Sequence, residues 1–313
     1  MDQRLTARVT EGSILVETNI LSIHTRIALR PGTVGIWASW IVAVRLGIKT
    51  SLQPWDIVAI RFLVAGVILL PYLLKKCPAV NRLGWIGLTA IMLGGGAPMV
   101  MLSYGGLLFA PAAHAASLFT ALIPLYVALL AAIVLGEKFI VAKRIGLASV
   151  VAGALGMRQS IGDAMFIGAG ILWACYTVAM RKARLAGPHA AAIAAVGSLI
   201  IYVPAYAIGF GTSLFSAPWR DIVLQAVVQG ILTAIVSFLL YGRAVNILGA
   251  SNGSSFAALA PVVTAILAIP ILGEWPIAGD WISMVLISGG VYFASGGPLG
   301  GLVPTNVTRQ SWS

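Results

Sequence analysis

Long apolar stretches, separated by short gaps that contain polar residues or proline, run along most of the chain. Each stretch is about 20 residues long, the length that a helix needs to cross the hydrocarbon core of a bilayer. Breakers such as Gln53-Pro54 and Gly187-Pro188 separate several of them, and a proline suits the first turn of a helix. The pattern predicts an all-α polytopic membrane protein with ten transmembrane helices, over residues 31–48, 54–74, 83–107, 111–135, 140–158, 162–182, 188–210, 219–241, 249–273 and 277–296.

The composition favours a membrane protein over a soluble one. Hydrophobic residues make up 59% of the chain and charged residues 9%, whereas soluble domains carry about 25% charged residues. The net charge of +11 would suggest nucleic acid as a partner in a soluble protein. Here the basic residues lie in the gaps between apolar stretches, so no nucleic acid is expected. The expected partners are the lipid bilayer and a small-molecule substrate; the oligomeric state stays open, and a monomer is compatible with the sequence.

The distribution of lysine and arginine predicts the orientation in the membrane. With the N-terminus placed in the cytoplasm, 15 of these residues fall on the cytoplasmic side and 5 on the other side. Cytoplasmic loops of membrane proteins carry such an excess. We therefore expect a multi-pass protein of the inner (plasma) membrane with cytoplasmic tails at residues 1–30 and 297–313. Cys77 and Cys175 form no metal-ligand motif and no Walker loop occurs, so no cofactor or metal is expected.

The second half of the chain repeats the first at a shift of 137 positions. Tyr104-Gly105 matches Tyr241-Gly242, and Leu135-Gly136-Glu137 matches Leu272-Gly273-Glu274. The repeat unit holds five predicted helices, and because five is odd, the second copy enters the membrane from the opposite side. Inverted repeats recur in secondary transporters. The predicted repeats cover residues 31–158 and 159–296.

Several of these segments carry a family resemblance. The first predicted helix is rich in tryptophan and ends at Arg45, and the second reads Ala-Ile-Arg-Phe-Leu-Val-Ala-Gly from Ala59. The fourth contains Pro111 and Pro124 before Leu135-Gly136-Glu137. Because these motifs follow one another in this order within an inverted repeat, the chain resembles the drug/metabolite transporter superfamily, in its EamA-type ten-helix branch. The resemblance implies transport of amino acids, related metabolites or drugs.

Polar and aromatic residues within the predicted spans are candidates for the wall of a central cavity, because lipid disfavours polar side chains. Four polar residues follow one another at four-residue spacing and so share a helix face: Gln225, Gln229, Thr233 and Ser237. His114 can titrate near neutral pH, although it can equally serve packing. We predict that substrate is bound by stacking and hydrogen bonding to Trp40, Tyr104, His114, Ser117, Tyr176, Gln229, Asn252 and Ser255.

Three charged residues are predicted to have structural or gating roles. Arg61 lies inside the second predicted helix, where a charge costs about 2.5–3.5 kcal/mol; it either faces a cavity or anchors the fold. Glu137 and Glu274 occupy matching turns at the membrane edge, which favours a capping role over proton coupling. No acidic residue lies deep within a predicted span, and this disfavours exchange of protons for cationic drugs.

These observations predict a secondary transporter, and not an enzyme, that moves amino acids or related metabolites by alternating access, with export as the expected direction. A drug exporter of the same family is the alternative. A channel would differ in showing continuous conductance. The segment Gly249–Gly253 spells the GxSxG motif of serine hydrolases but lacks its strand-turn-helix context. An intramembrane hydrolase that uses Ser251 and His114 is therefore a remote alternative.

Overall fold

The computed structural model of the chain describes residues 38–76, 78–136, 141–157, 160–209, 213–236 and 260–294. Within these ranges the chain forms helices joined by short connections and contains no strand. The two predicted tails lie outside the described residues. So do Glu137, Asn252 and Ser255, and the predictions for these three residues stay predictions.

Apart from the short α10, the helices that the structure describes fall on the predicted spans, and some spans consist of two or three helices in series. Six are long and apolar enough to cross a membrane. This confirms an all-helical polytopic membrane protein. In chain order the described helices are residues 38–50, α2 (Pro54–Lys76), α3 (Val80–Gly95), α4 (Ala97–Gly106), α5 (Ala112–His114), η1 (Ala115–Ala121), α6 (Ile123–Leu135), α7 (Val141–Gly156), α8 (Ile161–Lys182), α9 (Gly187–Gly209), α10 (Ser213–Ser216), α11 (Trp219–Gln225), η2 (Ala226–Val236), α14 (Ala260–Leu272) and α15 (Ala278–Ala294).

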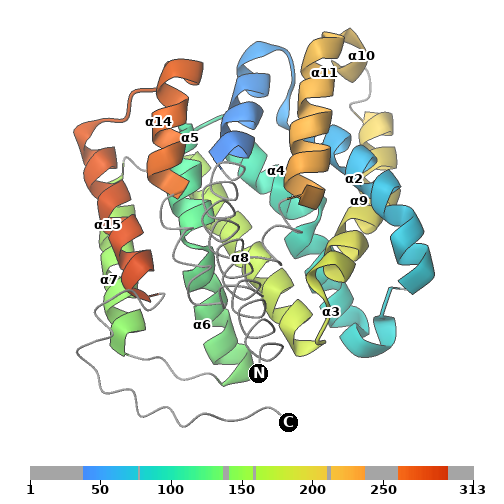
Figure 1. Cartoon of the computed structure of the whole chain (residues 1–313), viewed down its shortest axis with the longest axis horizontal. Helices are drawn as coiled ribbons and strands as arrows, with labels where there is room; N and C mark the ends of the chain where they lie inside the picture. The colour runs from blue at the N-terminus through green and yellow to red at the C-terminus, as the bar shows by residue number, and fades with distance from the viewer. Residues whose placement is uncertain are drawn as a thin grey trace, which may run out of the picture.

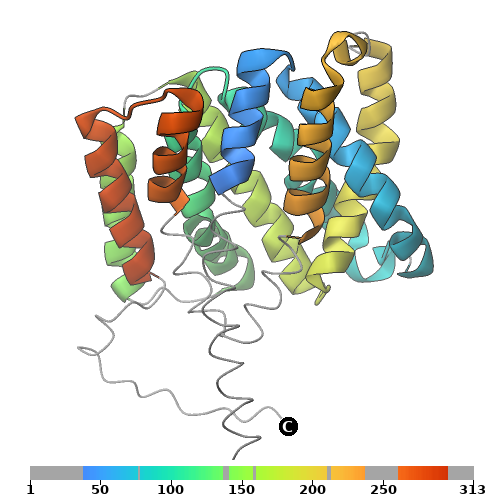
Figure 2. The ribbon, with the colours of Figure 1, turned by 45° about the horizontal axis from the view of Figure 1, so that its top comes forward.

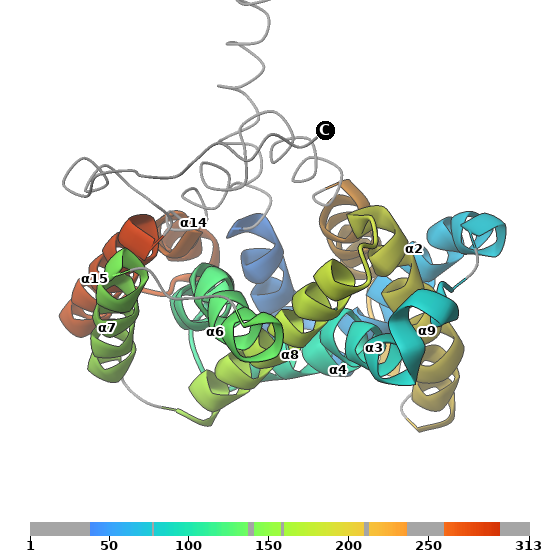
Figure 3. The ribbon, with the colours of Figure 1, turned by 90° about the horizontal axis from the view of Figure 1, so that it is seen from below.

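The helices stand side by side between two common ends (Figures 1 and 2). Helices α7 and α15 pack together at one edge, α2 packs on α9 at the other, and α8 runs between the two groups (Figure 3). Large apolar side chains point outward, such as Trp85 at 76% and Ile208 at 90% exposed. Exposure on this scale would be unfavourable in water, whereas lipid tails solvate it.

Polar contacts identify one of the two ends and give the polarity of the repeats. Arg45, near the last turn of helix 38–50, bonds Glu274, which follows α14. Asp163, in the first turn of α8, contacts His114 at the start of the fourth span. We call this end of the bundle the Glu274 end. Helix 38–50 therefore finishes at the Glu274 end, while its counterpart in the second repeat, α8, begins there, so the two repeats run in opposite directions.

Helices from different repeats approach one another so closely that glycine is required at some contacts. A Cβ atom added to Gly94 on α3 would lie 2.1 Å from the backbone oxygen of Leu172 on α8. Small residues allow such backbone contact between helices in membranes, where packing replaces the hydrophobic effect as the main attraction. Between α3 and α4, Gly96 leaves the helical conformation, with φ −99° and ψ −160°, and the third span bends there.

Candidate functional site

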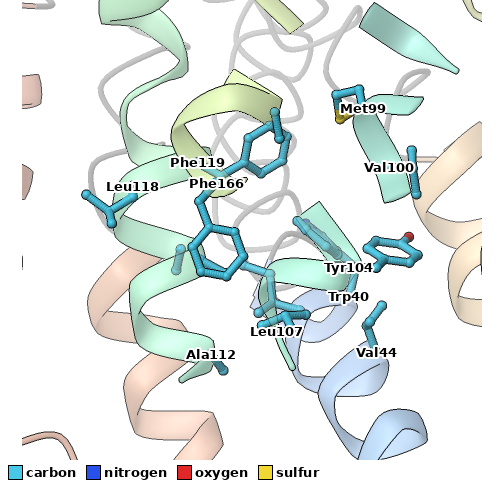
Figure 4. Packing of buried hydrophobic residues seen from close by; sticks show 14 of the residues in the cluster. Trp40, Val44, Met99, Val100, Tyr104, Leu107, Ala112, Leu118, Phe119 and Phe166 are labelled. Carbon is cyan, nitrogen blue, oxygen red and sulfur yellow. The ribbon is translucent and has the colours of Figure 1, made fainter. Parts of the chain in front are cut away.

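A row of aromatic side chains crosses the middle of the bundle. Trp40 lies against Tyr104, with ring centroids 5.7 Å apart, and meets Phe119 edge-on at 6.1 Å; Figure 4 shows Trp40 beside Tyr104. Phe119 in turn meets Trp173 edge-on at 6.5 Å, and Trp173 lies 5.2 Å from Tyr176. We call these five residues the aromatic row. It takes members from both repeats, and Trp40, Tyr104, Phe119 and Tyr176 are each at most 6% exposed.

One end of the aromatic row is joined to a buried polar network. Arg61 Nη1 on α2 donates to the Tyr104 hydroxyl at 3.1 Å. That hydroxyl donates to Gln229 Oε1 on η2 at 2.7 Å. Gln229 Nε2 completes the chain by donating to the backbone oxygen of Trp40 at 3.1 Å. We call Trp40, Arg61, Tyr104 and Gln229 the inner cluster; all four are at most 7% exposed.

Two segments with π-helical hydrogen bonding supply residues near this region. η1 carries Ser117 and Phe119, and η2 carries Gln229 and Thr233. The Thr233 hydroxyl donates to the oxygen of Val228, five residues earlier. π-helical turns are rare and occur frequently at functional sites. Gln225, the last residue of α11, is buried, as are Gln229 and Thr233 of η2.

A second buried polar group lies toward the Glu274 end. His114 Nδ1 lies 2.8 Å from Asp163 Oδ1, and Nε2 lies 3.2 Å from Asp280 Oδ1. We call these three residues the His114 cluster. A neutral imidazole carries only one N–H. Two nitrogen–oxygen hydrogen bonds therefore need a second proton, held either by the imidazole or by one of the carboxyl groups.

Both aspartates of the His114 cluster are fixed by their own helices. Asp163 Oδ2 accepts from the backbone N–H and the hydroxyl of Ser160, which completes a capping box at the start of α8. Asp280 Oδ2 accepts from the backbone N–H of Ile277 at 3.2 Å. Each aspartate therefore uses one oxygen to begin a helix and the other to hold His114. The result links α5 of the first repeat to α8 and α15 of the second.

A third group of polar contacts lies at the Glu274 end and centres on Glu274 itself. Glu274 Oε1 lies 2.7 Å from Arg45 Nε and 2.9 Å from Lys49 Nζ, and Oε2 accepts from the backbone N–H of Ala112 at 3.0 Å. Arg45 also donates to the backbone oxygen of Leu107. Burial alone would raise the pKa of Glu274. The Ala112 N–H and the two cations outweigh burial and hold the pKa below its usual value.

We expect Glu274→Gln to lower the thermal stability of the protein at neutral pH by about 2 kcal/mol, because charge-assisted hydrogen bonds are lost. The native pKa lies below the unfolded one, so this stabilisation is present at neutral pH and is lost as pH falls through the native pKa. The difference in stability is measured by thermal unfolding of the wild type and of Glu274→Gln in detergent between pH 7 and pH 4. The gap between the two Tm values should narrow toward acid.

The control for this prediction is Asp221→Asn, because Asp221 makes an exposed hydrogen bond with Ser51 at the same end. We expect it to change stability by less than about 0.5 kcal/mol, as surface substitutions usually do. A Glu274→Gln protein with the same Tm as the wild type at pH 7 would show that the Glu274 contacts add nothing to stability.

The structure brings four of the residues that we predict to bind substrate into one region. Trp40, Tyr104 and Tyr176 belong to the aromatic row, and Gln229 belongs to the inner cluster. His114 differs, because both of its ring nitrogens contact aspartates. Ser117 is fully buried and donates to the oxygen of Ala113, which leaves its own oxygen able to accept. The substrate-binding roles themselves remain proposals.

The partners of His114 and of Glu274 could not be predicted from sequence patterns. Asp163 and Asp280 stand in the first turns of their helices, where an acidic residue is usually explained by capping alone. The Ser-x-x-Asp spacing from Ser160 signals the capping box, but no sequence pattern connects it to His114, which lies 49 residues away. The contact between Arg45 and Glu274 spans 229 residues and carries no local signal either.

Comparison with known proteins agrees with this architecture of a polytopic helical membrane protein made of two repeats. The model of the EamA-like transporter family matches residues 32–159 and again residues 160–296. The chain belongs to the EamA-like transporter family, as the resemblance within the drug/metabolite transporter superfamily predicted.

Individual relatives are more distant. An "Uncharacterized transporter" of Archaeoglobus fulgidus is 26% identical over 287 residues, covering 87% of this chain and 96% of the relative. A "Probable terminal-alkyne amino-acid exporter" of Streptantibioticus cattleyicolor is 29% identical over 262 residues, covering 78% and 84% of the two chains. A solved crystal structure matches with a TM-score of 0.54 at 21% identity, over 87% of this chain and 96% of the other. At that identity the likeness speaks for the fold alone.

Proposed function

We propose that this chain is a secondary transporter that exports amino acids or related small metabolites by alternating access. The observation that carries the proposal is the inner cluster together with the aromatic row. Together, these two groups of residues bring hydrogen-bonding groups and aromatic rings from both repeats into the middle of the bundle. Sites of secondary transporters lie at such repeat interfaces. The relative from Streptantibioticus cattleyicolor, named an amino-acid exporter, supports this substrate class.

The contacts at the Glu274 end support a conformation in which that end is closed. The contacts of Glu274 with Arg45 and Ala112 join residues of the first repeat to a residue of the second, and so does the His114 cluster. For a solute to pass, contacts of this kind have to break while others form at the opposite end. The excess of lysine and arginine in the loops of the opposite end supports a topology in the plasma membrane with both termini in the cytoplasm.

The remaining alternatives find less support in the site. A drug exporter for lipophilic cations would use the aromatic row, but Arg61 places a positive charge beside it. The hydrolase hypothesis needs a free His114 nitrogen, and both are occupied by aspartates. Membership of a transporter family also argues against catalysis.

Flux into proteoliposomes tests the proposal. Purified protein is reconstituted, the vesicles are loaded with one unlabelled amino acid at a time, and entry of the labelled compound is followed. We expect saturable entry that unlabelled solute on the opposite side accelerates. Gln229→Leu should lower the flux at least about tenfold, since a buried hydrogen-bonding network is left unpaired.

The matched control is Gln53→Leu, because the side chain of Gln53 is exposed in the connection before α2. It should carry solute at the wild-type rate. Flux of lipophilic cations without flux of any amino acid would support the drug exporter. A current that does not saturate with solute would indicate a channel. Either result would contradict the proposal.

A further inference from the structure

Arg61 is a buried cation with unused donors. Its side chain is 7% exposed, and its Nε atom has no hydrogen-bond partner in the part of the chain that the structure describes. A guanidinium group has five N–H donors. Within the described ranges, the contacts of this group are the Tyr104 hydroxyl and the face of Phe62, whose centroid lies 5.8 Å from the guanidinium carbon. Neither contact removes the positive charge.

No acidic residue of the described ranges neutralises Arg61. The five described acids each have partners elsewhere: Asp56 bonds Tyr206, Asp163 and Asp280 bond His114, Asp221 bonds Ser51, and Glu274 bonds Arg45 and Lys49. None of them lies within 4.0 Å of a nitrogen of Arg61. A charge in the membrane interior costs about 2.5–3.5 kcal/mol, and such residues are usually paired. An arginine without an acidic partner among the described residues is suited to receive an anion from outside the chain.

The surroundings of Arg61 favour a carboxylate on an organic solute over a free inorganic ion. A guanidinium fork binds a carboxylate through two parallel hydrogen bonds, and Nε with one Nη is one of the pairs of donors that can do so. The Tyr104 hydroxyl, which bonds Arg61, belongs to a ring that lies against Trp40, with the ring centroids 5.7 Å apart. Further along the aromatic row, the Tyr176 hydroxyl is buried and has no hydrogen-bond partner in the described ranges. The acidic group and the organic part of one solute therefore find complementary groups next to one another.

We propose that Arg61 binds the carboxylate of the transported solute, so that the substrates are organic carboxylates, with amino acids among them, and not amines or lipophilic cations. This inference rests on the proposed function and narrows its substrate class. The inner cluster then has two states. In the closed state described here, Arg61 bonds Tyr104. In the loaded state the carboxylate takes the vacant Nε and a neighbouring Nη.

The test compares three probes that differ in the charge that Arg61 would meet: phenylalanine, phenylalanine amide and phenethylamine. Each is assayed for flux in proteoliposomes, and each is assayed for the rise in Tm that it gives to purified protein in detergent. The variants are Arg61→Gln and, in case that protein does not fold, Arg61→Lys, which keeps the charge but loses the fork. Arg220→Gln is the matched control, because Arg220 is exposed on α11.

Of the three probes, we expect only phenylalanine to be transported by the wild type and by Arg220→Gln, and only phenylalanine to raise the Tm of these two proteins. Arg61→Gln should abolish both effects, and Arg61→Lys should raise KM for phenylalanine about tenfold or more, as loss of one bidentate contact does. Phenylalanine flux with an unchanged KM in both Arg61 variants would overturn the inference while the proposed function stands. Wild-type flux of phenethylamine but not phenylalanine would overturn both. If no probe is carried and none raises the Tm, the carboxylate site is refuted as well as the amino-acid substrate class.

Discussion

Replacing His114 by leucine is expected to lower the free energy of unfolding by about 3–5 kcal/mol, the range measured when one partner of a buried ion pair is removed. The substitution keeps the size of the side chain but leaves the Oδ1 atoms of Asp163 and Asp280 without a donor in a buried site. The three helices that His114 joins would then lose their connection at the Glu274 end. The measurement is the Tm of purified protein, followed by loss of monodisperse protein on heating in detergent.

Two further variants distinguish the loss of hydrogen bonds to Asp163 and Asp280 from a simple loss of packing. The triple variant His114→Leu with Asp163→Asn and Asp280→Asn removes both buried carboxyl groups, so it should regain a large part of the lost stability. His189→Leu is the control for histidine loss, since the His189 ring lies outside the cluster and meets Tyr72 edge-on at 6.2 Å; it should cost much less than His114→Leu. A His114→Leu protein that unfolds at the wild-type temperature would contradict the role given to the cluster.

Gly94→Ala is expected to be among the most damaging single-methyl additions at the glycines that the structure describes. The new Cβ would lie 2.1 Å from the backbone oxygen of Leu172 and 2.9 Å from the Cβ of Tyr176. A backbone atom cannot turn away as a flexible side chain can, so α3 and α8 have to separate. Overpacking costs about 1–3 kcal/mol in well-packed cores and occasionally more. We expect at least the upper part of this range, together with loss of flux, because Tyr176 belongs to the aromatic row.

Two glycines in other helices serve as controls for this change. A Cβ on Gly289 of α15 would meet nothing within 4 Å, and one on Gly168 of α8 would make an ordinary contact of 3.6 Å with Leu102. Alanine at these positions should leave stability unchanged or raise it by about 0.4–1 kcal/mol, because alanine restricts the unfolded chain. If all three variants show the same Tm, the contact between α3 and α8 is looser than described.

The parts of the fold that follow from local pattern could be read from the sequence. Apolar stretches of similar length predict the transmembrane helices. Because each repeat holds an odd number of these helices, the second repeat is predicted to have the opposite orientation in the membrane. The burial of Gln229 also follows from pattern, because the glutamine recurs with Gln225 and Thr233 on one helix face. In each case the physical cause, exclusion of polar groups from lipid, acts on residues close together in the chain.

The pairing of polar groups could not be read in the same way. Tyr104 and Gln229 are separated by 125 residues, and His114 and Asp280 by 166. Their contacts depend on how helices cross, which the hydrophobic pattern does not determine. The role of Asp163 is a further example: its position in a capping box accounts for one carboxylate oxygen, and only the packing of α5 against α8 shows what the other oxygen holds.

The close backbone contacts also determine which helices can move together. Besides Gly94 on α3 against α8, Gly66 on α2 lies against Leu199 and Ala195 of α9, and Gly153 on α7 lies against Ser283 and Ile287 of α15. Each of these pairs takes one helix from each repeat. Any rearrangement that preserves these contacts moves α2 with α9 and α7 with α15. The units that move together in such a rearrangement are pairs with one helix from each repeat, and they do not coincide with the two halves of the sequence.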